Sequence, residues 1–283
     1  MLLANFLGAD ALSKPQMNIG WERKLIWCVS PRREKGIRNM LYEAHQQRDA
    51  WVLQMPGNAI GEGLSGSSFS LRQHQHLGRA QERPEHLHQI NNGWAGRYRL
   101  LSDGRRQITA LYLPGDVCDP CWLDGSRAIQ SVVALTPLQT IRAPRRELEA
   151  QAGNDAGLTQ FLWRQTRFSQ QIHAEWLVNL GRKNAMERLA HLLCELYCRL
   201  SLVGHATGPS CEMPLTQLDL ADLAGLTPVH VNRTLQEMRA MRMIELHSRR
   251  LTILDWPSMR RMAWFDPHYL GGNAAIEQLQ VAA

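Results

Sequence analysis

The chain of 283 residues is long enough for one large domain or two smaller ones, and its 44% hydrophobic and 20% charged residues predict an apolar core. No apolar run approaches the roughly 20 residues that span a bilayer, and the opening MLLANFLGADAL lacks the basic start of a secretory signal. Six dispersed cysteines make no disulfide framework, so we expect a cytoplasmic protein with no membrane partner. The net charge of +6 is compatible with a polyanionic binding partner.

Residues 1–85 carry no pattern that assigns them to a domain. The stretch GNAIGEGLSGSSFS, residues 57–70, is rich in glycine and serine and predicts a loop or linker. Residues 39–55 show no clear helical periodicity. We leave 1–85 as an unassigned N-terminal segment, either an extension or a divergent part of the domain that follows.

Residues 86–150 predict a small antiparallel β domain. GWAGRYRLL and RRQITALYL are typical of strands, and Asp103-Gly104 between them is a hairpin signal. AIQSVVALTPLQTIRA predicts two further strands around Thr136-Pro137. Short strands at this spacing indicate a barrel or sandwich.

A long amphipathic helix is predicted over residues 154–181. Asn154 and Asp155 can cap it, and it runs to about Leu180. Its apolar positions form a broad stripe: Leu158, Phe161, Leu162, Phe168, Ile172, Trp176 and Leu180. A helix of this length either packs on the preceding domain or pairs with a copy of itself. A second amphipathic helix follows from about Asn184 to Leu200.

Residues 182–270 carry the signals of a winged helix-turn-helix. Thr216 caps a helix with Asp219 at its third position, and Gly225 ends it. Thr227 and Pro228 start the next helix at once. Two short helices joined in this way form a helix-turn-helix. The alternating MIELHSRRLTIL that follows predicts a hairpin with arginines at its tip, a wing.

The second helix of this pair presents polar side chains suited to DNA. Residues 225–261 hold seven arginines against three acidic residues, which indicates a polyanionic partner. In a major groove, asparagine pairs with adenine and arginine with guanine, while wing arginines contact phosphate. The predicted DNA-binding residues are Thr227, Val229, His230, Asn232, Arg233, Gln236, Arg249 and Arg250.

The stretches GWAGRYRLLSDGRRQITALYLPGDVCD, EWLVNLGRKNAMERLAHLLCELYCRL and PLTQLDLADLAGLTPVHVNRTLQEMRAMRMIELHSRRLTILD resemble those of Crp/Fnr-type bacterial transcription regulators. The resemblance implies an α+β chain with an N-terminal cyclic-nucleotide-binding-like, barrel-like sensor domain, a dimerisation helix and a C-terminal winged helix-turn-helix, followed by a tail over 271–283. It implies a homodimer on a palindromic operator, with RNA polymerase as a further partner, and no enzyme activity.

The chain departs from the family pattern in both the recognition helix and the sensor domain. Many members carry Glu, then Ser or Gly, then Arg in the recognition helix, where this chain has Val229, Asn232 and Arg233. Nucleotide-binding members carry a Gly-Glu-rich phosphate cassette followed by Arg-Ser or Arg-Ala. Here GDVCDPCWLDGSRAIQS has no Gly-Glu-Leu-Gly run, and Arg127-Ala128 stands in another context. We therefore predict no cyclic-nucleotide cofactor and leave the effector open.

Two other clusters suggest chemistry. Cys118 and Cys121 form a Cys-x-x-Cys pair, which is typical of buried thiols or of a redox switch, so a thiol-based redox protein is the alternative function. His74 and His76, with the pair at 86 and 88, would share strand faces and converge on a metal if the strands adjoin. Solvated histidines are the simpler explanation, and we predict no metal site.

Overall fold

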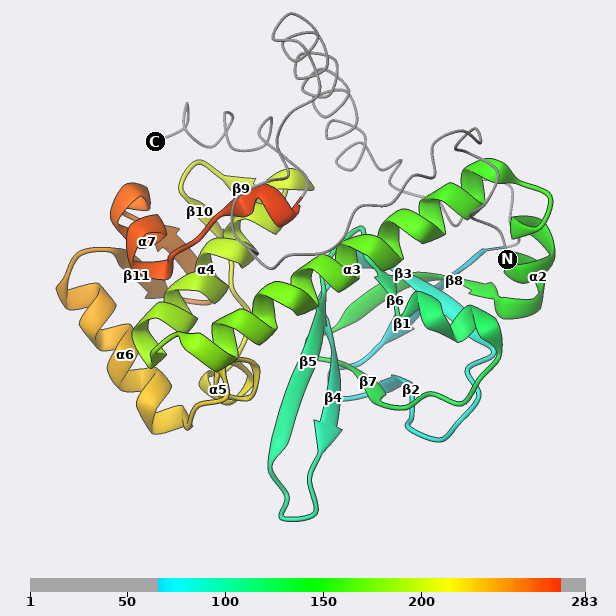
Figure 1. The fold of residues 1–283 in the computed structure, drawn as a ribbon, viewed down its shortest axis with the longest axis horizontal. Helices are drawn as coiled ribbons and strands as arrows, with labels where there is room; N and C mark the ends of the chain where they lie inside the picture. Colours follow the sequence, from blue (N-terminus) through cyan, green and yellow to red (C-terminus); the bar gives the residue numbers. More distant parts are fainter. Residues whose placement is uncertain (1–65, 271–283) are drawn as a thin grey trace, which may run out of the picture. The chain divides into compact units, whose positions relative to one another are not determined.

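The computed structural model describes residues 66–270, which fall within one compact unit, Ala44–Ala283. The described part is α+β, as predicted: a β domain, a long helix and a C-terminal winged helix-turn-helix follow in chain order (Figure 1). The expectations for residues 1–65 and for the tail 271–283 lie outside the described residues.

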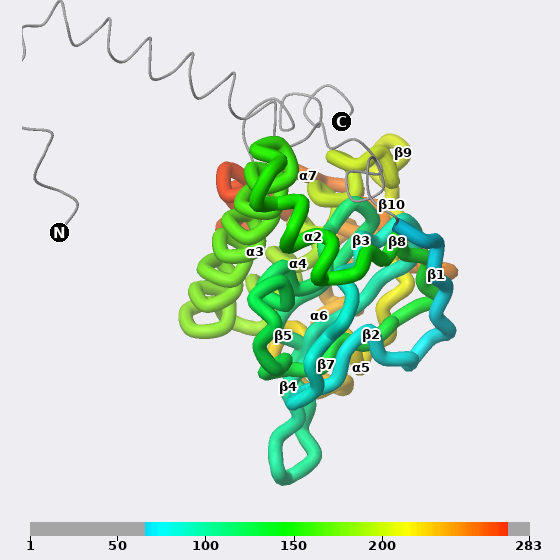
Figure 2. The backbone as a smooth tube through the Cα atoms, turned by 90° about the vertical axis from the view of Figure 1, so that its right-hand side faces the viewer, coloured from blue at the N-terminus to red at the C-terminus, as the bar shows by residue number. Residues whose placement is uncertain are grey.

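Two antiparallel four-stranded sheets form the barrel-like β domain (Figure 2). One sheet has the order β1-β8-β3-β6, with strands Ser67–Leu71, Leu138–Pro144, His86–Asn92 and Val117–Cys118. The other has the order β2-β7-β4-β5, with strands His76–Gly78, Ser131–Ala134, Ala95–Leu100 and Arg106–Tyr112. Between β6 and β7 lies a short 3-10 helix, η1, Pro120–Asp124.

The β domain begins earlier than the sequence indicated. β1 and β2 precede residue 86, and β1 overlaps the segment 57–70 that we had predicted to be a loop. That prediction is wrong for Ser67–Ser70. Serine-rich sequence carries little strand signal of its own, and it is the antiparallel pairing with β8 that makes β1 a strand.

The predicted hairpin is confirmed, since β4 pairs with β5 around the turn at Asp103-Gly104. The strands around Thr136-Pro137 are also confirmed as β7 and β8, but they do not pair with each other. The chain crosses there from one sheet to the other, and the Thr136 hydroxyl accepts the backbone N–H of Trp94 at 2.9 Å.

The two predicted helices are confirmed with their caps. After a short helix α2, Arg145–Ala152, helix α3 runs from Ala156 to Arg182, and the Asp155 carboxylate accepts from two N–H groups of its first turn. Helix α4, Ala185–Leu202, starts with a capping box in which Asn184 and Glu187 satisfy each other's backbone N–H groups.

The remaining elements form the winged helix-turn-helix. Its helices are α5, Gln217–Ala224, α6, Pro228–Ala240, and α7, Trp256–Ala263, and a 3-10 turn η2, Pro267–Leu270, follows. Its sheet has the order β11-β12-β10-β9, with strands Ile244–His247, Arg250–Ile253, Ser210–Glu212 and Ala206–Thr207.

Strand β5 contributes to both hydrophobic cores. Ala110 and Tyr112 pack inside the β domain with η1 and the start of α3. Ile108 and Leu111 pack on the other side, in a core shared with α3, α4 and the winged helix-turn-helix. The β domain and the C-terminal part therefore share apolar packing through one strand. Over residues 66–270 no helix combines the length and apolarity needed to cross a membrane.

Candidate nucleic-acid interface

Local signals fix the angle between α5 and α6. Thr216 and Asp219 form a capping box at the start of α5, and Gly225 ends the helix with φ of 63°, in the left-handed region. A Cβ at Gly225 would lie 3.3 Å from Leu180 of α3, so a larger residue would be both strained and crowded. The backbone N–H of Leu226 donates to the Ala221 carbonyl and closes the turn at 3.0 Å.

Helix α6 buries one face and exposes the other. Val231, Leu235 and Met238 are 0–1% exposed and fix the helix against α4, α5 and the wing. Thr227 caps the helix, its hydroxyl accepting the N–H of His230 at 3.2 Å. The predicted contact residues of this helix are exposed, apart from half-buried Asn232: Thr227, Val229, His230, Arg233 and Gln236.

The wing is the hairpin β11–β12. Ser248 and Arg249 both have positive φ, 49° and 59°, so two non-glycine residues make its tight turn. The Arg249 carbonyl accepts the N–H of Met213 at 2.8 Å, which holds this strained turn against the sheet. The side chains of Arg249 and Arg250 are exposed, as the prediction of phosphate contacts requires.

One contact in α6 was not anticipated from the sequence. The Arg233 Nε donates to Glu237 Oε1 at 3.0 Å, one helical turn further on. The i, i+4 spacing was the available signal for this pair. The Arg233 side chain remains 80% exposed, so its two terminal nitrogens stay open to a ligand.

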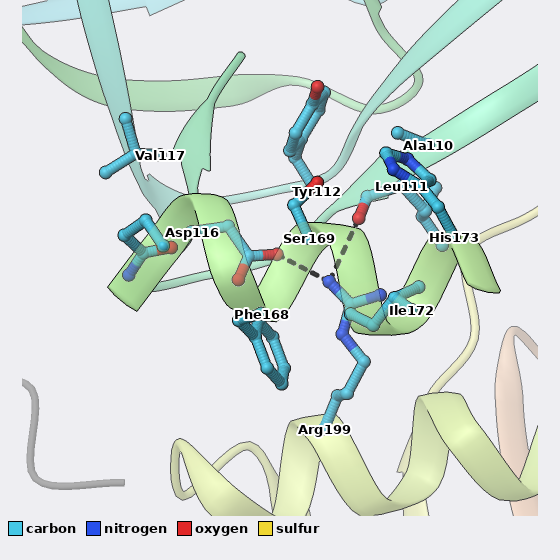
Figure 3. A pocket seen from close by; sticks show the side chains of 11 residues that line it. Ala110, Leu111, Tyr112, Asp116, Val117, Phe168, Ser169, Ile172, His173 and Arg199 are labelled. Atoms are coloured by element: carbon cyan, nitrogen blue, oxygen red, sulfur yellow. Dashed lines mark hydrogen bonds and ion pairs between the residues drawn. The ribbon is translucent and has the colours of Figure 1, made fainter. Parts of the chain in front are cut away.

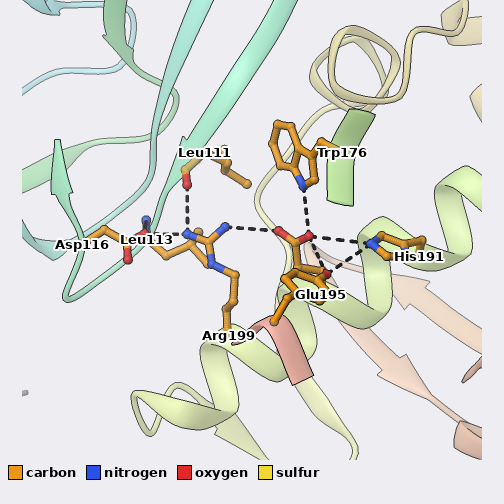
Figure 4. Close-up of polar contacts among 8 residues, drawn as sticks. Leu111, Leu113, Asp116, Trp176, His191, Glu195 and Arg199 are labelled. Carbon is orange, nitrogen blue, oxygen red and sulfur yellow. Dashed lines mark hydrogen bonds and ion pairs between the residues drawn. The ribbon is translucent and has the colours of Figure 1, made fainter. Parts of the chain in front are cut away.

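A buried polar network joins the β domain, α3 and α4 (Figure 4). Glu195 of α4 is fully buried and accepts from Trp176 Nε1 of α3 at 2.9 Å. Arg199, one turn further, donates to Glu195 at 3.4 Å and to Asp116 of the β domain at 2.6 Å. Burial raises the pKa of Glu195, and the Arg199 charge opposes that shift. Removing one member would strand a buried charge, so this network ties the helices together only as a complete set.

The β domain and helices α3 and α4 border a crevice (Figure 3). Its lining residues are Ala110, Leu111, Tyr112, Asp116, Val117, Gln165, Phe168, Ser169, Ile172, His173 and Arg199. Beside it, Arg97 of β4 pairs with Asp119 at 3.0 Å and shares a hydrogen bond with His173 of α3 at 3.0 Å. Salt bridges inside the chain therefore already engage the charged groups of this region.

The residues at the place of the family's phosphate cassette do not suit a cyclic phosphate. The carboxylate of Asp119 lies at the start of η1, where a bound phosphate would need hydrogen-bond donors. Arg97 forms a salt bridge with this carboxylate and neutralises its charge. Arg127 is exposed and donates to the Gln81 carbonyl at 2.7 Å. We therefore derive no role for a cyclic nucleotide in this chain.

The cysteine pair is poorly placed for redox chemistry. Cys118 is buried in β6, whereas Cys121 is exposed in η1. Burial raises the pKa of both thiols, and neighbouring carboxylates, Asp116 and Asp119 for Cys118 and Asp119 for Cys121, add to the shift. A raised pKa lowers the thiolate fraction, which is the reactive form. The structure therefore does not favour the redox alternative.

The histidine pairs do not come together. His76 lies in β2 and bonds to the Tyr98 hydroxyl at 3.0 Å, while His88 lies in β3 of the other sheet and bonds to Thr140 at 3.0 Å. Within residues 66–270 no group of three or more metal-ligating side chains occurs.

These features define a DNA-binding protein of the winged helix-turn-helix class attached to a β-rich sensor-like domain. The family model described as a Crp-like helix-turn-helix domain matches residues 187–262, and that of a cyclic nucleotide-binding domain matches 68–155. The chain belongs to the Crp/Fnr family of transcriptional regulators.

Relatives and solved structures agree with this assignment. The chain is 34% identical over 179 residues to the nitrogen fixation regulation protein FixK of Azorhizobium caulinodans, covering 63% of this chain and 71% of that one. It is 26% identical to the fumarate and nitrate reduction regulatory protein of Vibrio cholerae, over 67% and 75% of the two chains. The structure of FixK2 from Bradyrhizobium japonicum superposes with a TM-score of 0.64 at 30% identity, over 70% and 98%.

Proposed function

We propose that this chain is a homodimeric regulator that reads a palindromic operator through α6 and contacts phosphates through the wing. The observation that carries the proposal is the division of α6 into a fully buried apolar face and an exposed polar face, capped by Thr227. Arg233 and Gln236 are exposed on this face and Asn232 beside them is half-buried, and all three side chains match base edges in a major groove.

An apolar stripe on α3 supports dimerisation. Trp163, Leu177 and Val178 are 70%, 73% and 50% exposed, which is costly for a helix left in water. Trp163 and Leu177 lie two heptads apart with the polar Gln170 between them, and the exposed Ala174 and Gly181 lie on the same side of the helix as Leu177. The open space at Gly181 would let a second helix approach closely. Pairing of two α3 helices would place two α6 helices for two half-sites.

The division of labour follows from this arrangement. We assign the β domain, from Ser67, to sensing, α3 to dimerisation and the part from α4 onward to DNA binding. RNA polymerase is the expected protein partner of such a regulator, and the cytoplasm its place of work. The alternative thiol-based function is disfavoured, because burial raises the pKa of both Cys118 and Cys121 and so lowers their thiolate fraction.

Selection of bound duplexes from a random pool, at fixed salt, tests the proposal. The full-length protein is used after reduction and again after oxidation. We expect a two-fold symmetric site in both states. Enrichment in only one state would return Cys118 and Cys121 to the centre of the mechanism, and absence of enrichment in both would contradict sequence-specific binding by the protein alone.

A further inference from the structure

Arg106, the first residue of β5, binds two aspartates of α5. Its Nε donates to Asp222 Oδ2 at 2.6 Å, and its Nη2 donates to Asp219 Oδ1 at 2.9 Å. The three side chains are mostly buried, with 24% of Arg106 and 12% of each aspartate exposed. The neighbouring Gln107 donates to the Leu223 carbonyl at 3.3 Å. We call Arg106, Asp219 and Asp222 the clasp.

The clasp is attached to the start of α5 through Asp219. The second oxygen of this carboxylate accepts from the backbone N–H of Thr216 at 3.1 Å and from its hydroxyl at 2.6 Å. One carboxylate thus caps the helix and holds the arginine. On the hairpin side, the guanidinium lies 5.8 Å from the centre of the Tyr98 ring in β4. A planar guanidinium held by two carboxylates on one helix face fixes direction as well as distance.

The far end of the same strand has a second attachment. Arg199 of α4 donates to the Leu111 carbonyl at 2.9 Å and to Asp116 at 2.6 Å (Figure 4). One end of β5 therefore binds α5 and the other binds α4. Because both ends of β5 are bound in this way, the helix-turn-helix cannot rotate relative to the β domain without breaking charge-assisted hydrogen bonds.

We propose that Arg106 is a positioning residue for operator recognition, which holds α5, and through it α6, at the angle that a dimer needs to reach two half-sites. The inference rests on the proposed function. The spacing of half-sites that a dimer accepts depends on where its two recognition helices lie. Weakening the clasp should therefore reduce affinity for the operator more than affinity for DNA in general. The preference for one half-site spacing should be reduced most.

The test compares Arg106→Ala with Arg105→Ala in the full-length protein. Arg105 is a matched control because it pairs with Asp103 inside the exposed hairpin turn and its loss changes the net charge equally. Affinity is measured at fixed salt for the selected operator, for the same operator with two base pairs inserted between half-sites, and for random duplex.

We expect Arg106→Ala to weaken operator binding about tenfold, while random-duplex binding stays within about twofold of that of Arg105→Ala. The preference for normal over stretched spacing should shrink in Arg106→Ala only. Equal behaviour of the two variants would overturn the inference, and so would tighter operator binding by Arg106→Ala, because the clasp would then oppose recognition.

Asp222→Asn is a second variant that tests the clasp if Arg106→Ala folds poorly. It leaves the Asp219 cap of α5 in place. It should reproduce the loss of spacing preference in part, and the double variant should be no weaker than Arg106→Ala alone. Unaltered spacing preference in a folded Asp222→Asn protein would contradict the clasp. If the wild type selects no operator at all, the proposed function fails first, which is a different result from a wild type that selects one and ignores Arg106.

Discussion

Glu237 accepts a hydrogen bond from Arg233 one turn before it in the recognition helix, at 3.0 Å from the Nε. The Nε edge of the guanidinium is thereby occupied, and the two terminal nitrogens are left as the donor fork. Many members of the family carry an acidic residue one turn before this arginine, where this chain has Val229. The carboxylate that steadies Arg233 therefore lies on its other side.

Replacing Glu237 with glutamine should separate affinity from specificity. Loss of a negative charge near phosphates should raise affinity for random duplex. The neutral amide oxygen holds Arg233 less firmly than the carboxylate does, so the ratio of operator to random binding should fall about twofold. Competition titrations at one salt concentration measure this ratio. Glu245→Gln, on wing strand β11 opposite Thr252, removes the same charge and should leave the ratio unchanged.

Arg233→Ala should cost about 1–3 kcal/mol of operator binding and relax the base preference at one position of each half-site. The reason is that a bidentate arginine reads guanine by two acceptors, which alanine cannot replace. Selection repeated with the variant measures the base preference directly. An unchanged operator affinity would show that Arg233 reads no base.

Arg249→Ala should weaken binding to all duplexes alike. Its side chain is exposed at the tip of the wing, where a phosphate contact positions the protein without reading sequence. The slope of log affinity against log salt should become less steep by about one unit. A loss confined to the operator would instead place this side chain on a base.

Leu177→Asp should convert dimers into monomers without unfolding the chain. The side chain is 73% exposed in the single chain, so the substitution costs the isolated fold little, but it would bury charge between two paired helices. Sedimentation at micromolar concentration should show the shift in mass, with an unchanged circular dichroism spectrum. Arg164→Asp, about 100° around the helix from Trp163, is the control and should remain dimeric.

Acidification should destabilise the fold through His88. Burial, together with the charges of His86 and Arg142, lowers its pKa from 6.5 to about 4. Between pH 6.5 and pH 4 the imidazole stays neutral in the folded state, whereas in the unfolded state it binds a proton. The free energy of unfolding therefore has its full value above pH 6.5 and falls as the pH drops toward 4. The contribution of His88 to the loss in free energy of unfolding from pH 7 to pH 5 should be about 2 kcal/mol. Urea unfolding at both pH values should show a smaller difference in the free energy of unfolding for His88→Gln than for the wild type. An equal difference would show that His88 does not cause the loss.

The helix-turn-helix was predictable because its signals are local. Thr216, Asp219, Gly225 and Thr227 act on backbone groups within four residues of themselves, so chain order alone places the caps and the turn. The apolar spacing of α6 then determines which side faces the core. The opposite side, with exposed Arg233 and half-buried Asn232, is then the side left facing solvent.

The sequence by itself thus determined helices α3 to α6, the wing hairpin and the polar face of α6, whereas β9, β10 and α7 were not predicted. Only the tertiary structure decided that Ser67–Leu71 is a strand, that β7 and β8 lie in different sheets, and that the histidine pairs stand apart. It also decided the clasp, because Arg106 lies 113 residues from Asp219. Pairing between distant segments depends on which surfaces the whole chain buries together, and no local pattern records that choice.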